Sequence, residues 1–445
     1  MISERANLAR ALFAEAYPGS SAPKVFRAPG RVNLIGEHTD YNGLSVLPMT
    51  IDRAVYLACA PRTDLRLRFA SANAEFGPRE YDLKALPAAS TVQDWTRYLI
   101  AVIEQLGSSG RQVGADLLVL SDLPPEGGLS SSSTLTVAMG LAWLHIQGRS
   151  PGNRIAFAEA LTLAERRTGT ESGGMDQAAC LLGGESHAVK IDFFPLRVES
   201  VPLFKKSSFV LCDSLVRANK GGEAKAPYNR GPRLGRVMAA MLEAQLRVER
   251  NDPVRVERLG DLYTGDIAFN HDEVELLFDK VFGKTDWTRT SVSTFHSEST
   301  GTDTLDALSD LSGLSDLSGP FPLAAMARHQ RTEHKRVEMA RNAALANDTE
   351  TFGALMNASH ESCARDYNVS CPELDELVVC ARNAGALGAR LTGAGFGGYT
   401  VNLVHNDDIE SFADKVRTAY YAHRPPSTAD PTFVAKPSPA AGEVH

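Results

Sequence analysis

A short stretch near the start of the chain places charged and hydrogen-bonding side chains directly after a strand-like segment. In GRVNLIGEHTDYNGLSVLP, residues 30–48, the first apolar positions alternate as in a β-strand, and Glu37, His38 and Asp40 follow close together. Fixed acceptors and donors with this spacing suit a small ligand that carries several hydroxyl groups. Arg31 precedes them and adds a cation that could stabilise developing negative charge.

A loop rich in glycine and serine joins a predicted strand to a predicted helix. The loop PPEGGLSSSSTL spans residues 124–135, and its candidate ligand-binding positions are Gly127, Gly128, Leu129, Ser130, Ser131, Ser132 and Ser133. A helix start presents free backbone N–H groups and the positive end of the helix dipole, which favour a bound phosphate. The loop is not a Walker A motif, because no GK[ST] follows. The alternative interpretation is a flexible loop whose serine caps the helix.

Two more glycine-containing segments could contribute to a binding site. In GTESGGMDQAACLLGG, residues 169–184, Asp176 begins an apolar stretch of helical character. Its carboxylate could face a substrate hydroxyl, or it could be an ordinary helix cap. In LTGAGFGG, residues 391–398, four glycines connect two predicted strands. Such a loop allows the backbone to approach either a ligand or another loop closely.

Together these motifs indicate one kind of reaction. Phosphoryl transfer to a hydroxyl group needs a carboxylate near that hydroxyl and a cation near the developing charge. Asp176 and Arg31 could supply these groups, the serine loop could hold a nucleotide, and residues 37–40 could hold the acceptor. The residues alone therefore favour a small-molecule kinase.

The elements that must position these residues alternate between strands and helices without a strict β–α–β period, which predicts the α+β class. Strands are predicted at 53–60, 65–71, 187–193 and 208–214, and helices at 95–107, 154–169, 233–250, 327–347 and 373–384. Strand, loop and helix are predicted in order at 114–148, and strand, glycine loop and strand at 388–404. A tandem LSDLSG repeat at 308–319 predicts a surface insertion.

Composition limits the class of protein. The chain has 445 residues, enough for two or three domains at about 100–200 residues each. A net charge of −8 argues against a nucleic-acid partner. The six cysteines form no CxxC pair, and no apolar run is long enough to span a membrane. We therefore expect a cytoplasmic protein with free thiols and no membrane contact, and we expect a monomer.

The order of the motifs resembles that of the GHMP kinase superfamily. GRVNLIGEHTDYNG resembles the galactokinase signature, GLSSSS the nucleotide loop, GGMDQ the catalytic-aspartate motif and LTGAGFGG the third glycine motif. The resemblance covers about residues 25–436, with a gap around 285–322. It implies two lobes with the active site between them. The first, residues 1–205, would be similar to a ribosomal-protein-S5-like domain, and the second, residues 206–445, to a ferredoxin-like domain.

The resemblance also implies a role for each candidate residue. The activity would be ATP-dependent phosphorylation of galactose at C1. Asp176 would orient the C1 hydroxyl, and Arg31 would stabilise the transferring charge. The implied sugar-binding residues are Glu37, His38, Asp40 and Tyr228. Residues 127–133 would bind ATP, and Ser132 and Glu165 match positions that hold Mg²⁺ in the superfamily.

Two differences from the galactokinase motifs leave the identity of the sugar substrate open. Glu126 stands where galactokinases usually have glycine, and its carboxylate would repel a triphosphate unless it faces solvent or serves the metal. PPEGGLSSSS and GTESGGMDQ are closer to the N-acetylgalactosamine kinase branch, whereas EHTDYNG and Tyr228 resemble galactokinase. The alternatives are therefore a kinase of N-acetylgalactosamine or of another galacto-configured sugar, and a non-catalytic galactose sensor.

Overall fold

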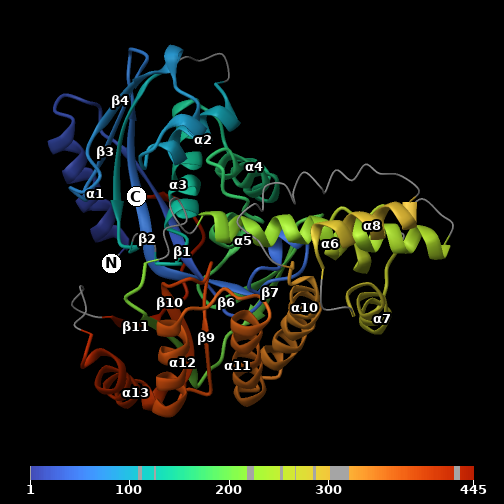
Figure 1. The fold of residues 1–445 in the computed structure, drawn as a ribbon. Helices are drawn as coiled ribbons and strands as arrows, with labels where there is room; N and C mark the ends of the chain where they lie inside the picture. The colour runs from blue at the N-terminus through green and yellow to red at the C-terminus, as the bar shows by residue number, and fades with distance from the viewer. Residues whose placement is uncertain are drawn as a thin grey trace.

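The computed structural model describes residues 2–108, 113–124, 127–217, 225–250, 254–265, 267–283, 287–300, 320–424 and 431–445. Two mixed layers of helix and sheet lie one above the other, and helices α6, α7 and α8 extend to one side (Figure 1). The tandem repeat at 308–319 and Glu126 lie outside the described residues.

The upper layer is built on a six-stranded sheet in the order β12-β1-β2-β5-β3-β4. Its strands are β1 (Lys24–Asn33), β2 (Pro48–Pro61), β3 (Arg66–Ser71), β4 (Arg79–Asp82), β5 (Ala115–Ser121) and β12 (Gly442–Val444). Its helices are α1 (Ile2–Ala16), α2 (Arg97–Leu106), α3 (Ser131–Ile146), α4 (Arg154–Arg166) and α5 (Met175–Leu182). Alternation along β2 explains why helices cover both faces: Leu57 and Cys59 pack with α2–α5, while Tyr56 and Ala58 pack under α1.

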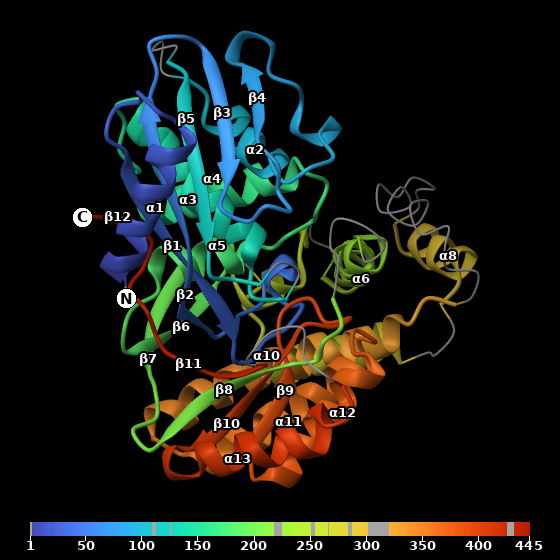
Figure 2. The same ribbon diagram turned by 90° about the vertical axis from the view of Figure 1, so that its left-hand side faces the viewer.

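The lower layer is a four-stranded sheet in the order β11-β8-β10-β9 (Figure 2). Its strands are β8 (Ser207–Asp213), β9 (Gly388–Leu391), β10 (Tyr399–His405) and β11 (Thr432–Ala435). The helices beneath it are α11 (Thr349–Arg365), α12 (Pro372–Ala384) and α13 (Ile409–Val416). Val210 and Cys212 pack with α12 and α13, whereas Phe209 and Leu211 join the core of the upper layer, to which Phe352 of α11 also belongs. The two layers therefore share a hydrophobic core.

The remaining strands and α-helices of the described chain form one hairpin and four helices. A hairpin pairs β6 (His187–Asp192) with β7 (Arg197–Pro202). The other helices are α6 (Lys225–Arg250), α7 (His271–Phe282), α8 (Arg289–Thr300) and α10 (Leu323–Leu345). Among the described residues, no helix has the length and apolar character that a membrane span requires.

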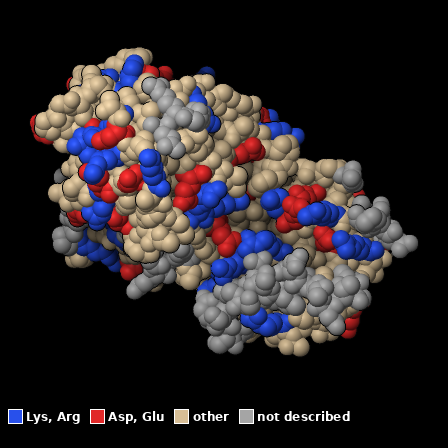
Figure 3. Space-filling model, turned by 90° about the horizontal axis from the view of Figure 1, so that it is seen from above, with Lys and Arg blue, Asp and Glu red and all other residues tan. Residues whose placement is uncertain are grey.

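The predicted α+β class is confirmed, and every strand and helix predicted above overlaps an element of the same type. The predicted boundary between the two lobes, at residues 205 and 206, falls between β7 and β8. There the chain passes from the β6–β7 hairpin to the four-stranded sheet. The end of the chain then returns to the first sheet, because β12 pairs antiparallel with β1. On the face in Figure 3, acidic and basic side chains are interspersed in small groups.

Candidate active site

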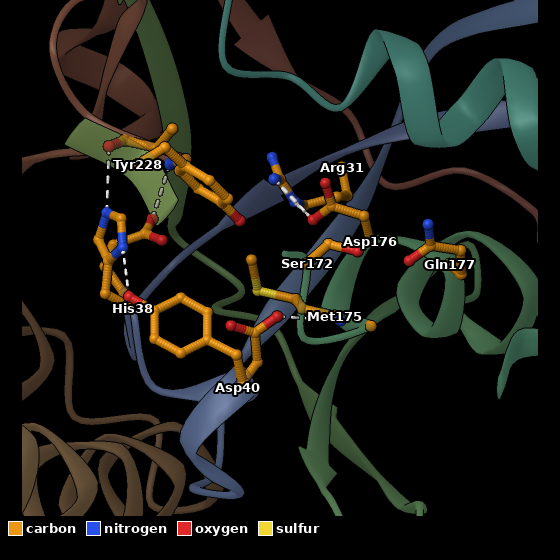
Figure 4. Close-up of a pocket in the computed structure, with 13 residues that line it drawn as sticks. Arg31, His38, Asp40, Ser172, Met175, Asp176, Gln177 and Tyr228 are labelled. Carbon is orange, nitrogen blue, oxygen red and sulfur yellow. Dashed lines mark hydrogen bonds and ion pairs between the residues drawn. The ribbon is translucent and has the colours of Figure 1, made fainter. Parts of the chain in front are cut away.

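Arg31 is the centre of the site. It leaves β1 at an irregularity where the pairing with β2 shifts register between Pro29 and Arg31, and its side chain is only 2% exposed. Its Nε and Nη2 both donate to Oδ1 of Asp176 at 2.7 Å, and Nη1 donates to the Gly128 carbonyl at 2.7 Å. One guanidinium thus joins the Asp176 motif to the serine loop, and Figure 4 shows its contact with Asp176.

Asp176 lies in the first turn of α5, but it does not cap the helix. The N-cap is Gly174, in the left-handed region at φ 109°, and no side chain caps this end. The Asp176 carboxylate turns toward Arg31, and its Oδ2 accepts a hydrogen bond from Ser133 at 3.2 Å. The helix-cap interpretation of Asp176 is therefore wrong, and its carboxylate is available at a pocket wall.

The serine loop leads into the start of α3. Ser130 is the N-cap, in the left-handed region at φ 65°, but its hydroxyl makes no capping bond and lies buried with no hydrogen-bond partner among the described residues. The serine-cap interpretation is thus also wrong. The Leu129 side chain packs into the core, so only its backbone could face a ligand. The helix start remains available for an anion.

Glu165 lies beside this helix start. Its carboxylate oxygens accept hydrogen bonds from Ser132 at 2.9 Å, Ser133 at 2.7 Å and Gln177 at 2.5 Å. A carboxylate and a hydroxyl next to a helix N-terminus offer the hard oxygen donors that Mg²⁺ prefers. No group of three or more His, Cys, Asp or Glu side chains in the described chain could hold a metal. One hydroxyl and one carboxylate fit an ion that takes most of its ligands from phosphate and water.

The loop of residues 36–42, called the signature loop below, forms the opposite wall, but its side chains have protein partners. Oε1 of Glu37 accepts from the Gly393 N–H at 2.8 Å and from Arg390 at 3.3 Å. The His38 imidazole contacts the Tyr41 hydroxyl through Nδ1 at 2.8 Å and the Ala394 carbonyl through Nε2 at 3.1 Å. Because a carbonyl only accepts, Nε2 carries a proton. A bond from His38 to a sugar hydroxyl would replace one of these contacts.

Asp40 is a buried carboxylate of this loop. Gly173 leaves room for it, since a Cβ there would lie 2.3 Å from the Asp40 carboxyl carbon. Burial, and then the charge of Asp176, raises the pKa of Asp40 from its ordinary 3.8 to about 6, although a backbone N–H bond from Met175 opposes the rise. Hydrogen bonds donated by hydroxyl groups of a ligand would stabilise the charged form of this buried carboxylate.

These residues meet in one pocket. It is lined by Arg31, Glu37, His38, Asp40, Asp176 and Tyr228 among others. Tyr228 comes from α6, and its ring centroid lies 6.0 Å from that of His38. Burial raises the pKa of the Tyr228 phenol well above 10, so it remains a neutral hydroxyl. Segments remote in sequence thus surround a common space (Figure 4).

The third glycine motif closes on the serine loop. A Cβ at Gly393 would lie 2.5 Å from the Gly128 carbonyl oxygen, and one at Gly398 would lie 2.7 Å from that of Gly127. Both glycines have positive φ angles, 83° and 84°. Of the two interpretations of this motif, close approach to another loop is therefore correct for these positions.

Several residues that shape the pocket were not identified from the sequence. Arg390 is completely buried against Glu37, and Tyr41 and Tyr367 join their hydroxyls at 3.0 Å beside His38. Glu333 on α10 accepts from the backbone of the signature loop. Helix α10 carries polar residues at positions whose spacing puts them on one face, a pattern that could have marked this helix as unusual.

The comparisons with known proteins agree with this arrangement. A model described as the galactokinase galactose-binding signature matches residues 11–61, and models of the GHMP kinase N-terminal and C-terminal domains match residues 97–184 and 340–422. A galactokinase from Dictyostelium discoideum is 33% identical, with 92% of this chain and 86% of that protein aligned. A galactokinase from Roseiflexus is 34% identical over 89% of this chain and 87% of that protein.

This chain belongs to the galactokinase family. The resemblance drawn from its motifs is therefore confirmed. A solved structure of Lactococcus lactis galactokinase complexed with galactose superposes with a TM-score of 0.75 at 27% identity, covering 98% of this chain and 99% of that one. Methanococcus jannaschii mevalonate kinase shares the fold, with a TM-score of 0.57 at 15% identity.

Proposed function

We propose that this protein transfers the γ-phosphate of ATP to the C1 hydroxyl of galactose, giving galactose 1-phosphate. The observation that carries the proposal is the Arg31–Asp176 pair, which lies between the signature loop and the serine loop in a chain of the galactokinase family. The pair stands where an acceptor held by one loop would meet a phosphate held by the other.

In this proposal Asp176 orients the acceptor hydroxyl. Its Oδ1 accepts from Arg31 at 2.7 Å and its Oδ2 lies 3.2 Å from the Ser133 hydroxyl, and in this proposal Oδ2 is the atom that would accept the C1 proton. Arg31 keeps this carboxylate in place and carries a positive charge next to it. In a loose phosphoryl-transfer transition state, positioning and charge stabilisation contribute more than proton removal.

The serine loop would hold the nucleotide. Backbone N–H groups of residues 127–133 at the start of α3 would bind its phosphates, and Ser132 and Glu165 would hold Mg²⁺. When bound, the metal neutralises charge on the phosphate oxygens. The Ser133 hydroxyl lies 2.7 Å from Glu165 and 3.2 Å from Asp176, so its single proton can be donated to either carboxylate and the hydroxyl lies between the metal-binding group and the one that orients the acceptor.

The signature loop would hold the sugar. Asp40 would accept hydrogen bonds from sugar hydroxyls, which relieve the cost of its burial, and Tyr228 would flank the ring. Glu37 and His38 would contact the sugar while holding the loop to residues 390–394. All six cysteines are free thiols, which supports the proposal of a reducing, cytoplasmic setting.

An assay of ADP release with Mg·ATP and a panel of sugars tests the proposal. Galactose should give the highest kcat/KM, and phosphorus NMR of the product should show a phosphate on C1. Faster turnover of N-acetylgalactosamine than of galactose would instead support the related sugar kinase. Binding of galactose and ATP without ADP release would support a sensor.

A further inference from the structure

Helix α10 presents buried polar side chains to the backbone of the signature loop. His329, Gln330 and Glu333 are each 0% exposed, although the helix belongs to a part of the chain almost 300 residues later. Because buried polar groups are costly unless they are hydrogen-bonded, such a row needs a specific set of partners.

The partners are the backbone groups of residues 36–38. Oε1 of Glu333 accepts from the Gly36 N–H at 2.9 Å and from the Glu37 N–H at 3.3 Å. Nε2 of His329 contacts the Glu37 carbonyl at 3.0 Å, and Nε2 of Gln330 donates to the His38 carbonyl at 2.8 Å. Two amides and two carbonyls of the loop are thus bonded by a single face of one helix.

The loop needs this external support. Gly36 and His38 both have left-handed backbones, at φ 97° and 59°, and the second is uncommon for a residue with a Cβ. A Cβ at Gly36 would lie 2.9 Å from Cγ2 of Val337, so α10 packs directly on this backbone. The directions of the Glu37 and His38 side chains depend on these backbone angles.

The charge states of Glu333 and His329 allow them to hydrogen-bond the backbone of residues 36–38. Burial opposes ionisation of Glu333, but Arg336 and its other partners lower its pKa to about 2, so it is an acceptor at neutral pH. Burial lowers the pKa of His329, which keeps its ring neutral. Nε2 donates to the Glu37 carbonyl at 3.0 Å, and Nδ1 lies 2.9 Å from the Ser362 hydroxyl.

We propose that His329, Gln330 and Glu333 are positioning residues that hold the signature loop in its sugar-binding conformation. They act through the backbone of residues 36–38 and do not touch the sugar. The inference rests on the proposed function, because the acceptor bound by this loop is taken to be galactose. It predicts that substitutions of these three residues weaken sugar binding and leave nucleotide binding intact.

The first test is Gln330→Met, which keeps the side-chain length and leaves no buried charge. Loss of one bond should raise the KM for galactose about tenfold, while the KM for ATP stays within about twofold. Lys335→Gln, at an exposed position of the same helix, is the matched control and should change neither. An unchanged galactose KM in Gln330→Met, with or without a lower melting temperature, would overturn the proposal.

The second test does not require turnover. In Glu333→Met the amides of Gly36 and Glu37 should exchange hydrogen at least about tenfold faster, measured by mass spectrometry on a peptide spanning residues 34–42. Glu333→Gln keeps an acceptor and should restore much of the protection. Equal exchange in both variants and in the wild type would refute the proposal.

The two tests also separate this inference from the proposed function. A wild-type protein that does not phosphorylate galactose would contradict the proposed function, whatever the exchange experiment gives. A wild type that phosphorylates galactose, together with a Gln330→Met variant of unchanged galactose KM, would contradict only the role of α10.

Discussion

Replacing Asp40 with asparagine should make the free protein more stable while it impairs sugar binding. Asp40 is buried beside Asp176, and the raised pKa of its carboxyl means that ionisation at neutral pH costs folding free energy. An asparagine of the same shape removes that cost and still offers an oxygen to the Met175 N–H.

The size of the effect follows from the pKa. A rise from 3.8 to about 6 corresponds to about 3 kcal/mol of lost stability once the carboxyl is fully ionised. The sign follows from proton binding. Between these two pKa values the folded protein holds the proton more tightly than the unfolded chain, so this residue's contribution to stability falls as pH rises. The advantage of Asp40→Asn should therefore grow from about pH 4 and level off above about pH 6.

Melting temperatures of the wild type and Asp40→Asn, compared at about pH 5 and about pH 7.5, measure this effect. The advantage should increase by about 1.4 kcal/mol over the interval, because roughly one unit of the shift lies within it. Asp116→Asn is a control of opposite sign. Burial opposes ionisation there too, but hydrogen bonds from Arg68, Ser20 and Arg62 prevail and lower the pKa of Asp116, so this change should destabilise the protein at neutral pH.

Asp40→Asn should also raise the KM for galactose about tenfold to hundredfold, the range expected for loss of a hydrogen bond to a charged group. The reasoning would be refuted if Asp40→Asn were destabilised equally at both pH values. It would also be refuted if the variant bound galactose as tightly as the wild type does.

Three further variants test the catalytic groups. Asp176→Ala should lower kcat about a thousandfold and keep the melting temperature within a few degrees, and a normal kcat in an ADP-release assay would remove Asp176 from the mechanism. Arg31→Ala should lower kcat more than it raises either KM, because its charge acts in the transition state, and a change confined to KM would contradict this role. Glu165→Gln should raise the Mg²⁺ concentration that gives half-maximal rate about tenfold, and an unchanged Mg²⁺ dependence would exclude Glu165 as a ligand.

Local pattern was enough to predict much of the fold. The segments from strand to helix at 114–148 and from strand to strand at 388–404 were readable because turn residues separate well-marked apolar runs. Asp176 and Arg31 could be assigned to one reaction from the sequence because phosphoryl transfer needs a carboxylate near the acceptor hydroxyl and a cation near the developing charge. Their contact at 2.7 Å agrees with that pairing.

Long-range contacts could not be predicted in the same way. Nothing near Glu37 indicates that its carboxylate is bound by Arg390, since the two residues are 353 positions apart. Local pattern likewise gave two alternatives for Ser130 and for Asp176, and only tertiary packing showed that neither side chain caps its helix. Side-chain partners depend on which elements meet in space, which periodicity does not encode.

The pairing of β12 with β1 has a consequence for how the protein is made. Lys24 and Glu443, which form an ion pair across this ladder, are 419 residues apart. During synthesis on the ribosome, β1 therefore cannot pair with β12 until about 400 further residues have been made. During that interval its unpaired backbone is open to other nascent chains, and a chaperone that shields it would raise the yield of native enzyme.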